Sequence, residues 1–172
     1  MLVAALLAQT PEVRADPVGE TLWLDLDGIP GESTRVGFEN LIEIESFDWS
    51  VNSGNPPRFS TLTVRKHVDR ASPRLMLRAA KGSVIPGGAL HVIPVGGTHN
   101  DEFLTYCLTQ VRVRSVKTVG EGGNNQGMHE TVELSYRTFV EIYRQASPVG
   151  GLLPPVVGGW DTGEDKEFTS EC

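Results

Sequence analysis

The stretch NLIEIESFDWSV, residues 40–51, sets the fold class, because its apolar and polar residues alternate. Alternation with a period of two is typical of a β-strand that buries one face. The apolar positions are Ile42, Ile44, Phe47, Trp49 and Val51. Their parity changes after Ile44, and one extra residue at Glu45 or Ser46 would return both halves to the same face. The stretch therefore predicts one long strand that is bent by a β-bulge.

The same period of two continues through most of the chain. It predicts strands in Leu22–Leu26, Phe59–Val68, Ala89–Val95, Glu102–Val119 and Glu130–Arg144. In the second of these, Leu62, Val64 and Val68 are predicted to face inward. In the last, one face is predicted to carry Val132, Leu134, Tyr136, Val140 and Ile142. Long strands without alternating helices predict an all-β protein, an antiparallel sandwich or barrel.

One short helix interrupts the strands, in the stretch RASPRLMLRAAKG at residues 70–82. Ser72 is predicted to cap it, with Pro73 at the first helical position and Gly82 ending it in the left-handed conformation. Its apolar stripe is predicted to consist of Leu75, Met76, Ala79 and Ala80.

The bulk composition is that of one globular domain. The chain has 172 residues, of which 39% are hydrophobic and 22% charged, and its formal net charge is −7. An acidic chain disfavours nucleic acid and anionic membranes as partners. No apolar run approaches the about 20 residues of a membrane span, so no membrane insertion of the mature domain is expected.

Both ends of the chain lie outside the predicted domain of residues 20–168. Residues 1–19 form an N-terminal extension in which LVAALLA (Leu2–Ala8) and the small residues near Ala15 resemble a signal peptide, so a cleaved signal and a frayed extension are both open. Residues 169–172 are a tail. The two cysteines, Cys107 and Cys172, suggest neither a zinc site nor a disulfide framework, and Cys107 is interpreted as a core thiol.

No motif predicts catalysis. The DLDG sequence at residues 25–28 lacks the ligand spacing of a calcium loop, and GEGGNNQG at residues 120–127 lacks the Lys-Ser/Thr that a phosphate loop needs. The four histidines, His67, His91, His99 and His129, show no helical ligand pair. The expectation is a protein that is not an enzyme and that has no cofactor or metal.

Six stretches, in order, are similar to the haemolysin-coregulated protein (Hcp) family, the tube protein of type VI secretion. They are LDLDGIPGES (24–33), IEIESFDWSV (42–51), LTVRKHVDRASPRLMLRAAKGSVIP (62–86), EFLTYCLTQVRVRSVKTVGEGG (102–123), ETVELSYRTFVEIYR (130–144) and VVGGWDTGEDKEF (156–168). The resemblance implies a compact β-barrel of two sheets with one α-helix on its side, six copies of which form a ring.

The same resemblance implies a function. Stacked rings would build a tube that carries effector cargo, inside a contractile sheath and below VgrG-type spike proteins, and the subunit would be secreted from a cytoplasmic pool. The alternative is a signal-peptide-bearing secreted or periplasmic Hcp-like effector or ligand-binding barrel.

Two sets of residues are predicted to serve the assembly. Strand alternation sends the polar residues Ser46, Asp48 and Ser50 away from the core, which suits a wall facing the lumen of the ring. Ring stacking is assigned to a glycine-rich hairpin loop and to a turn near the N-terminus. These are Gly120, Glu121, Gly122, Gly123, Asn124 and Asn125 in the loop, and Asp27, Gly28, Pro30, Gly31, Glu32 and Ser33 in the turn.

Overall fold

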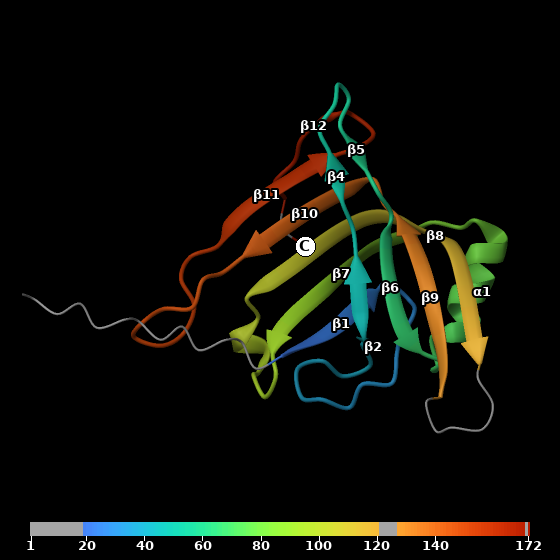
Figure 1. Ribbon diagram of the computed structural model, residues 1–172, viewed down its shortest axis with the longest axis horizontal. Helices are drawn as coiled ribbons and strands as arrows, with labels where there is room; N and C mark the ends of the chain where they lie inside the picture. Colours follow the sequence, from blue (N-terminus) through green and yellow to red (C-terminus); the bar gives the residue numbers. More distant parts are fainter. Residues whose placement is uncertain (1–18, 121–126, 171) are drawn as a thin grey trace, which may run out of the picture.

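A computed structural model describes residues 19–120, 127–170 and 172, and its body is a barrel of antiparallel strands (Figure 1). One α-helix, α1 (Ser72–Lys81), lies on the side of the barrel in the described part of the chain. A short 3-10 turn, η1, spans His99–Asp101. The strands are β1 (Glu20–Leu26), β2 (Ile42–Ile44), β3 (Ser46–Asp48), β4 (Val51–Asn52), β5 (Arg58–Phe59), β6 (Leu62–His67), β7 (Ile85–Pro94), β8 (Leu104–Gly120), β9 (Met128–Ser135), β10 (Thr138–Tyr143), β11 (Val156–Asp161) and β12 (Lys166–Glu167). The predicted fold class is confirmed.

Two sheets close the barrel because they share strand β8. The first half of β8 pairs with β7 and β10, and the second half pairs with β9. The first sheet has the order β12-β11-β10-β8-β7-β1-β2, and the second has the order β3-β6-β9-β8. Strand β8 passes from one sheet to the other between Val111 and Arg112, and a register shift between Val113 and Ser115 follows.

The bend predicted in residues 40–51 is the second place where the chain changes sheets. Strand β2 pairs with β1, β3 pairs with β6, and Glu45 between them belongs to neither strand. The Glu45 amide still donates to the Arg65 carbonyl at 2.8 Å, so the ladder continues across the break. The expectation that the strand runs on to an inward Val51 is wrong. Val51 is 48% exposed and lies in a separate β4–β5 ribbon.

Burial corrects two of the predicted faces. In β6 the third inward residue is Lys66, which is fully buried, whereas Val68 follows the strand and is 42% exposed. The segment 130–144 is two strands rather than one, because β9 pairs with β6 while β10 pairs with β11. Val132 and Leu134 therefore fill the main core, but Val140 and Ile142 belong to a separate apolar cluster.

Helix α1 differs from the prediction at its start and in its stripe. Ala71 is its N-cap and Ser72 its first residue, with the Ser72 hydroxyl turned to buried partners described below. Gly82 ends the helix in the left-handed conformation, as predicted. Leu75 is fully buried, whereas Met76 is 52% exposed, so the packed face is narrower than the predicted stripe. No helix among the described residues has the length and hydrophobicity that crossing a membrane requires.

The prediction for the cysteines is wrong. Cys107 of β8 forms a disulfide with Cys172, across a sequence separation of 65 residues. The bond ties the last residue of the sequence to the strand, so the predicted tail returns to the barrel at Cys172. Cysteine spacing alone does not reveal such a long-range pair.

Candidate functional site

The outer face of the β3-β6-β9-β8 sheet is polar along two cross-strand rows. Strand register gives the first row as Asp48, Thr63, Glu133 and Ser115, and the second as Ser46, Arg65, Thr131 and Lys117. The opposite face of the same strands carries buried residues such as Val64 and Val132. The first row carries both acids and the second row both cations, so the charges of these two rows balance.

The predicted lumen residues lie on this polar face or at its edge. Ser46, Asp48 and Ser50 are exposed, while Phe47 and Trp49 between them pack against the core. The Ser50 amide donates to Ser60 Oγ at 2.8 Å, which fixes the backbone where the sheet gives way to the β4–β5 ribbon.

The predicted hairpin loop extends from β8 and β9, whose pairing continues to Gly120 and Met128. Gly120 is exposed. Glu121, Gly122, Gly123, Asn124 and Asn125 lie outside the described residues. The base of the hairpin is anchored laterally, since the Val68 amide donates to the Met128 carbonyl at 2.9 Å.

The turn at residues 27–33 is exposed only in part. Asp27, Gly28 and Glu32 are exposed and Pro30 is half-buried, but Gly31 and Ser33 are buried against the chain near Leu41. A turn that makes a stacking contact should be exposed, and Gly31 and Ser33 do not meet that condition. A Cβ at residue 31 would lie 2.3 Å from the Leu41 carbonyl oxygen, so only glycine fits there.

Arginine side chains attach this turn to the start of α1. Arg70 donates to the carbonyl of Gly31, and its amide donates to Glu32 Oε1 at 2.9 Å. Arg74 donates to the Gly28 carbonyl at 2.9 Å. The turn and the segment that leads into α1 therefore form one connected surface.

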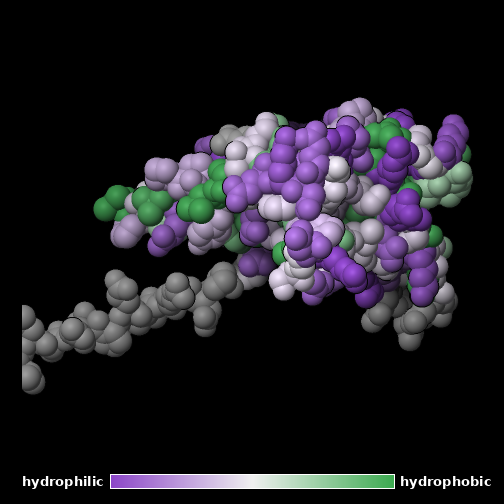
Figure 2. Space-filling model, turned by 90° about the horizontal axis from the view of Figure 1, so that it is seen from above, coloured by the Kyte–Doolittle hydropathy of each residue, from purple (hydrophilic) through white to green (hydrophobic). Residues whose placement is uncertain are grey.

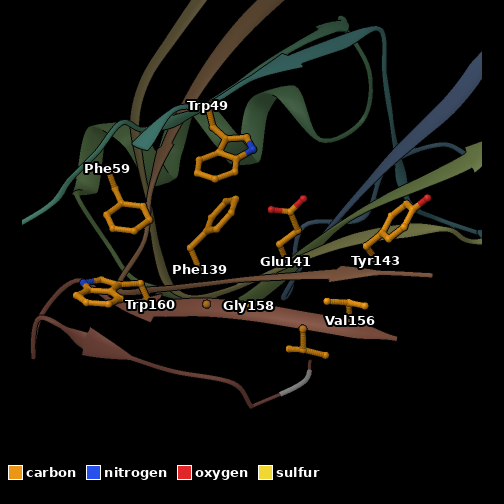
Figure 3. Close-up of a pocket in the computed structure, with 10 residues that line it drawn as sticks. Trp49, Phe59, Phe139, Glu141, Tyr143, Val156, Gly158 and Trp160 are labelled. Carbon is orange, nitrogen blue, oxygen red and sulfur yellow. The ribbon is translucent and has the colours of Figure 1, made fainter. Parts of the chain in front are cut away.

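An apolar groove of about 490 Å³ lies between the β4–β5 ribbon and strands β10 and β11. Figure 3 shows the aromatic rings that line it, with Trp49 close to Phe139 and Phe59 close to Trp160. The groove continues to Val156, which is 71% exposed. In Figure 2, hydrophobic surface gathers on the arm formed by the β10–β11 connection. No sequence pattern predicted this surface, because it depends on which strands lie across the groove from β10 and β11.

The structure gathers the four histidines into two acid-centred clusters. His91 Nδ1 lies 2.8 Å from Glu102 Oε1, and His99 Nδ1 lies 3.4 Å from Glu102 Oε2. Burial raises the pKa of Glu102, but hydrogen bonds from His91 and Thr105 outweigh it and hold the pKa below its usual range. His67 and His129 flank Glu45 in the other cluster.

Comparison with known proteins decides the family. The sequence profile described as "Type VI secretion system effector, Hcp" matches residues 23–143. The chain belongs to the Hcp family. Among curated Hcp proteins, hcp1 of Pseudomonas aeruginosa is 31% identical over 102 residues. That alignment covers 58% of this chain and 62% of the relative, so the chain matches less than two thirds of the relative's length.

Solved Hcp structures share the whole barrel. Hcp1 of Salmonella typhimurium is 31% identical, with a TM-score of 0.74 over 87% of this chain and 99% of that one. Hcp2 of the same organism is 29% identical, with a TM-score of 0.67 over 85% and 98% of the two chains. A type VI secretion system effector from Yersinia pestis has the same fold at 20% identity, with a TM-score of 0.72 over 82% and 99%.

Proposed function

We propose that this Hcp protein is the structural tube subunit of a type VI secretion system, with no catalytic role. Six copies form a ring, and rings stack into a tube that carries effector cargo and meets the sheath and VgrG-type spike proteins. One observation supports the proposal most directly. The polar rows lie on β3, β6, β9 and β8, whereas the exposed apolar residues lie on the β10–β11 arm. A ring needs both a hydrated lumen wall and an apolar contact between subunits.

The lateral contact is assigned to the β10–β11 arm and its groove. Exposed apolar residues concentrate there, including Val149, Leu153 and Val156. A contiguous apolar surface of this kind marks a protein contact. The test is the assembly state of the purified chain, measured by light scattering and negative-stain imaging. Rings of six copies are expected, and a monomer at every concentration up to millimolar would overturn the proposal.

Two variants separate ring formation from stacking. Val156→Asp places a charge in the arm and should convert rings into folded monomers. In the second variant an Asn-Gly turn replaces residues 121–127. The β8–β9 ladder ends at Gly120 and Met128, and a two-residue turn of this type can join two such strand ends. That variant should keep rings and lose tubes, and tubes equal to those of the parent would assign stacking to the turn at residues 27–33 instead.

The lumen assignment has its own test. Asp48→Arg reverses one charge on the polar face while leaving the packed side of β3 unchanged. Rings should persist and the set of co-purifying effectors should change. If Asp48→Arg dissociates rings while monomers stay folded, this face is a subunit interface.

A second candidate function is a secreted or periplasmic Hcp-like effector or ligand-binding barrel. The disulfide between Cys107 and Cys172 favours it, because structural disulfides persist in oxidising compartments. Mass spectrometry of the protein from cells distinguishes the two candidates. A mature N-terminus at Asp16 would support processing by a signal peptidase, whereas an intact N-terminus together with rings would support the tube.

A further inference from the structure

Three potential metal ligands converge at the end of the barrel where β6 ends and β9 begins. Glu45 Oε1 lies 2.8 Å from His67 Nε2, and Glu45 Oε2 lies 3.0 Å from His129 Nδ1. The two imidazole rings are 4.5 Å apart between centroids. Among the described residues, which include all four histidines of the sequence, this is the one group of three such side chains whose ligand atoms all lie within 4.8 Å of one another.

The backbone fixes this arrangement. His67 and His129 are direct cross-strand partners in the β6–β9 ladder, so their side chains leave the same face side by side. Glu45 occupies the break between β2 and β3, with its amide bonded to the carbonyl of Arg65 on β6. The two histidines therefore stand on paired strands, and a backbone hydrogen bond to β6 holds Glu45 beside them, so little conformational freedom remains to be lost on binding.

We propose that Glu45, His67 and His129 bind one divalent transition-metal ion, with Zn²⁺ the best match. Two imidazoles and a carboxylate, with a fourth position open to water, form a common ligand set for zinc. At zinc–ligand distances of about 2.1 Å, neighbouring ligand atoms in a tetrahedron stand about 3.4 Å apart. The distance of 2.8 Å between Glu45 Oε1 and His67 Nε2 would widen by about half an ångström to admit the ion. The ligand atoms of all three residues already lie within 4.8 Å of one another, so each pair is within about 1.4 Å of the tetrahedral spacing.

The surroundings favour a cation at this position. Arg65 Nε lies 3.0 Å from Glu45 Oε2, and this ion pair orients the carboxylate so that Oε1 can hold the metal. Three more acids, Glu32, Glu43 and Asp69, line the same hollow of about 320 Å³ as Glu45 and His67. Lys66 forms an ion pair with Asp69, and the backbone amide of Arg70 donates to Glu32, so the hollow keeps a negative charge.

The second histidine cluster provides a matched control. It has the same composition, two histidines and one glutamate, but His91, His99 and Glu102 do not bring three ligand atoms within 4.8 Å of one another. His99 is exposed, as is His67, so replacing either one removes an imidazole from the surface of the barrel. Geometry, rather than histidine content, is then the variable under test.

The experiment titrates the full-length, tag-free, disulfide-bonded chain with zinc chloride by calorimetry in a non-chelating buffer. One Zn²⁺ per chain is expected. His67→Ala and His129→Ala each remove a direct ligand and should weaken binding by more than the about 10- to 100-fold that loss of an outer-shell partner causes. His99→Ala should leave the affinity unchanged.

Circular dichroism of each variant shows whether the fold is intact, and His67→Asn replaces His67→Ala if the latter fails to fold. Nuclear magnetic resonance adds a second measurement, in which the imidazole signals of His67 and His129 should shift with zinc while that of His99 does not. Absence of stoichiometric binding would overturn the proposal. Equal loss of affinity in His99→Ala would overturn it as well.

Discussion

Replacing the buried Lys66 by methionine should destabilise the barrel strongly. Four oxygens surround Lys66 Nζ, and they belong to the His67 carbonyl at 2.6 Å, Asp69 at 2.8 Å, and Ser72 and Glu130 at 3.2 Å each. Glu130 is itself buried and accepts from the Ser72 hydroxyl at 2.6 Å. Lys66→Met keeps most of the side-chain volume but leaves the Glu130 carboxylate without its cation.

The magnitude follows from the burial of both partners. Removing one member of a buried ion pair costs about 3–5 kcal/mol, because the remaining charge is desolvated without compensation. For a chain of this size each 1 kcal/mol lowers the melting temperature by about 2–4 °C, which gives a decrease of about 6–20 °C. Urea unfolding followed by circular dichroism measures the loss of free energy, and thermal unfolding measures the shift in melting temperature.

Two further variants make the result interpretable. Lys117→Met removes an exposed lysine from β8 and should change stability by no more than about 0.5 kcal/mol. Adding Glu130→Gln to Lys66→Met removes the unpaired charge, so the double variant should be more stable than the sum of the single effects by about 1–3 kcal/mol. A loss below about 1 kcal/mol for Lys66→Met, or simple additivity, would refute the reasoning.

Two other perturbations have outcomes that follow from local contacts. Burial raises the pKa of Tyr136 to about 12, and its hydroxyl donates to the Ser60 carbonyl at 2.8 Å. The pKa of Tyr136 in the folded state therefore exceeds the usual value near 10. The stability that the neutral Tyr136 hydroxyl contributes is complete below pH 10 and is lost as the pH rises through 12. Urea unfolding between pH 9 and 12 should show that loss in the parent but not in Tyr136→Phe, and equal pH dependence in both would contradict it. Cys172→Ser opens a disulfide across 65 residues and should lower the free energy of unfolding by about 4 kcal/mol. Denaturation with and without reductant checks this, and a change below 1 kcal/mol in both would contradict it.

The alternation of apolar residues predicted an antiparallel sandwich or barrel, and the resemblance to the Hcp family selected the barrel. The alternation also located the bend at Glu45, because a parity change within one strand has few structural explanations other than an extra residue. The alternation did not predict that Lys66 is buried. A charged residue at an inward position gives no apolar signal, and its burial can be predicted only when its buried partners are known. Asp69, Ser72 and Glu130 supply those partners, and Glu130 comes from a distant strand.

The need to know distant partners also explains which parts of the candidate sites the sequence could predict. The polar residues Ser46 and Asp48 could be placed on an exposed face from alternation alone, because that property is local to one strand. The pairing of His67 with His129, the groove between Trp49 and Phe139, and the disulfide of Cys107 all depend on which strands become neighbours. Sequence periodicity gives the face of a residue but not its neighbour across the sheet.

Residues 68–72 connect the β8–β9 hairpin, the turn at residues 27–33 and the start of helix α1. The Val68 amide holds the base of the β8–β9 hairpin, Arg70 holds the turn at Gly31, and Ser72 joins the buried Lys66 network at the start of α1. These bonds start from the same short stretch, so they connect the hairpin base to the turn and to the start of the helix. Loops that act in recognition work best from a rigid scaffold. A stacking contact made by the hairpin would therefore be presented from a fixed base, and breaking the Lys66 network should weaken stacking as well as stability.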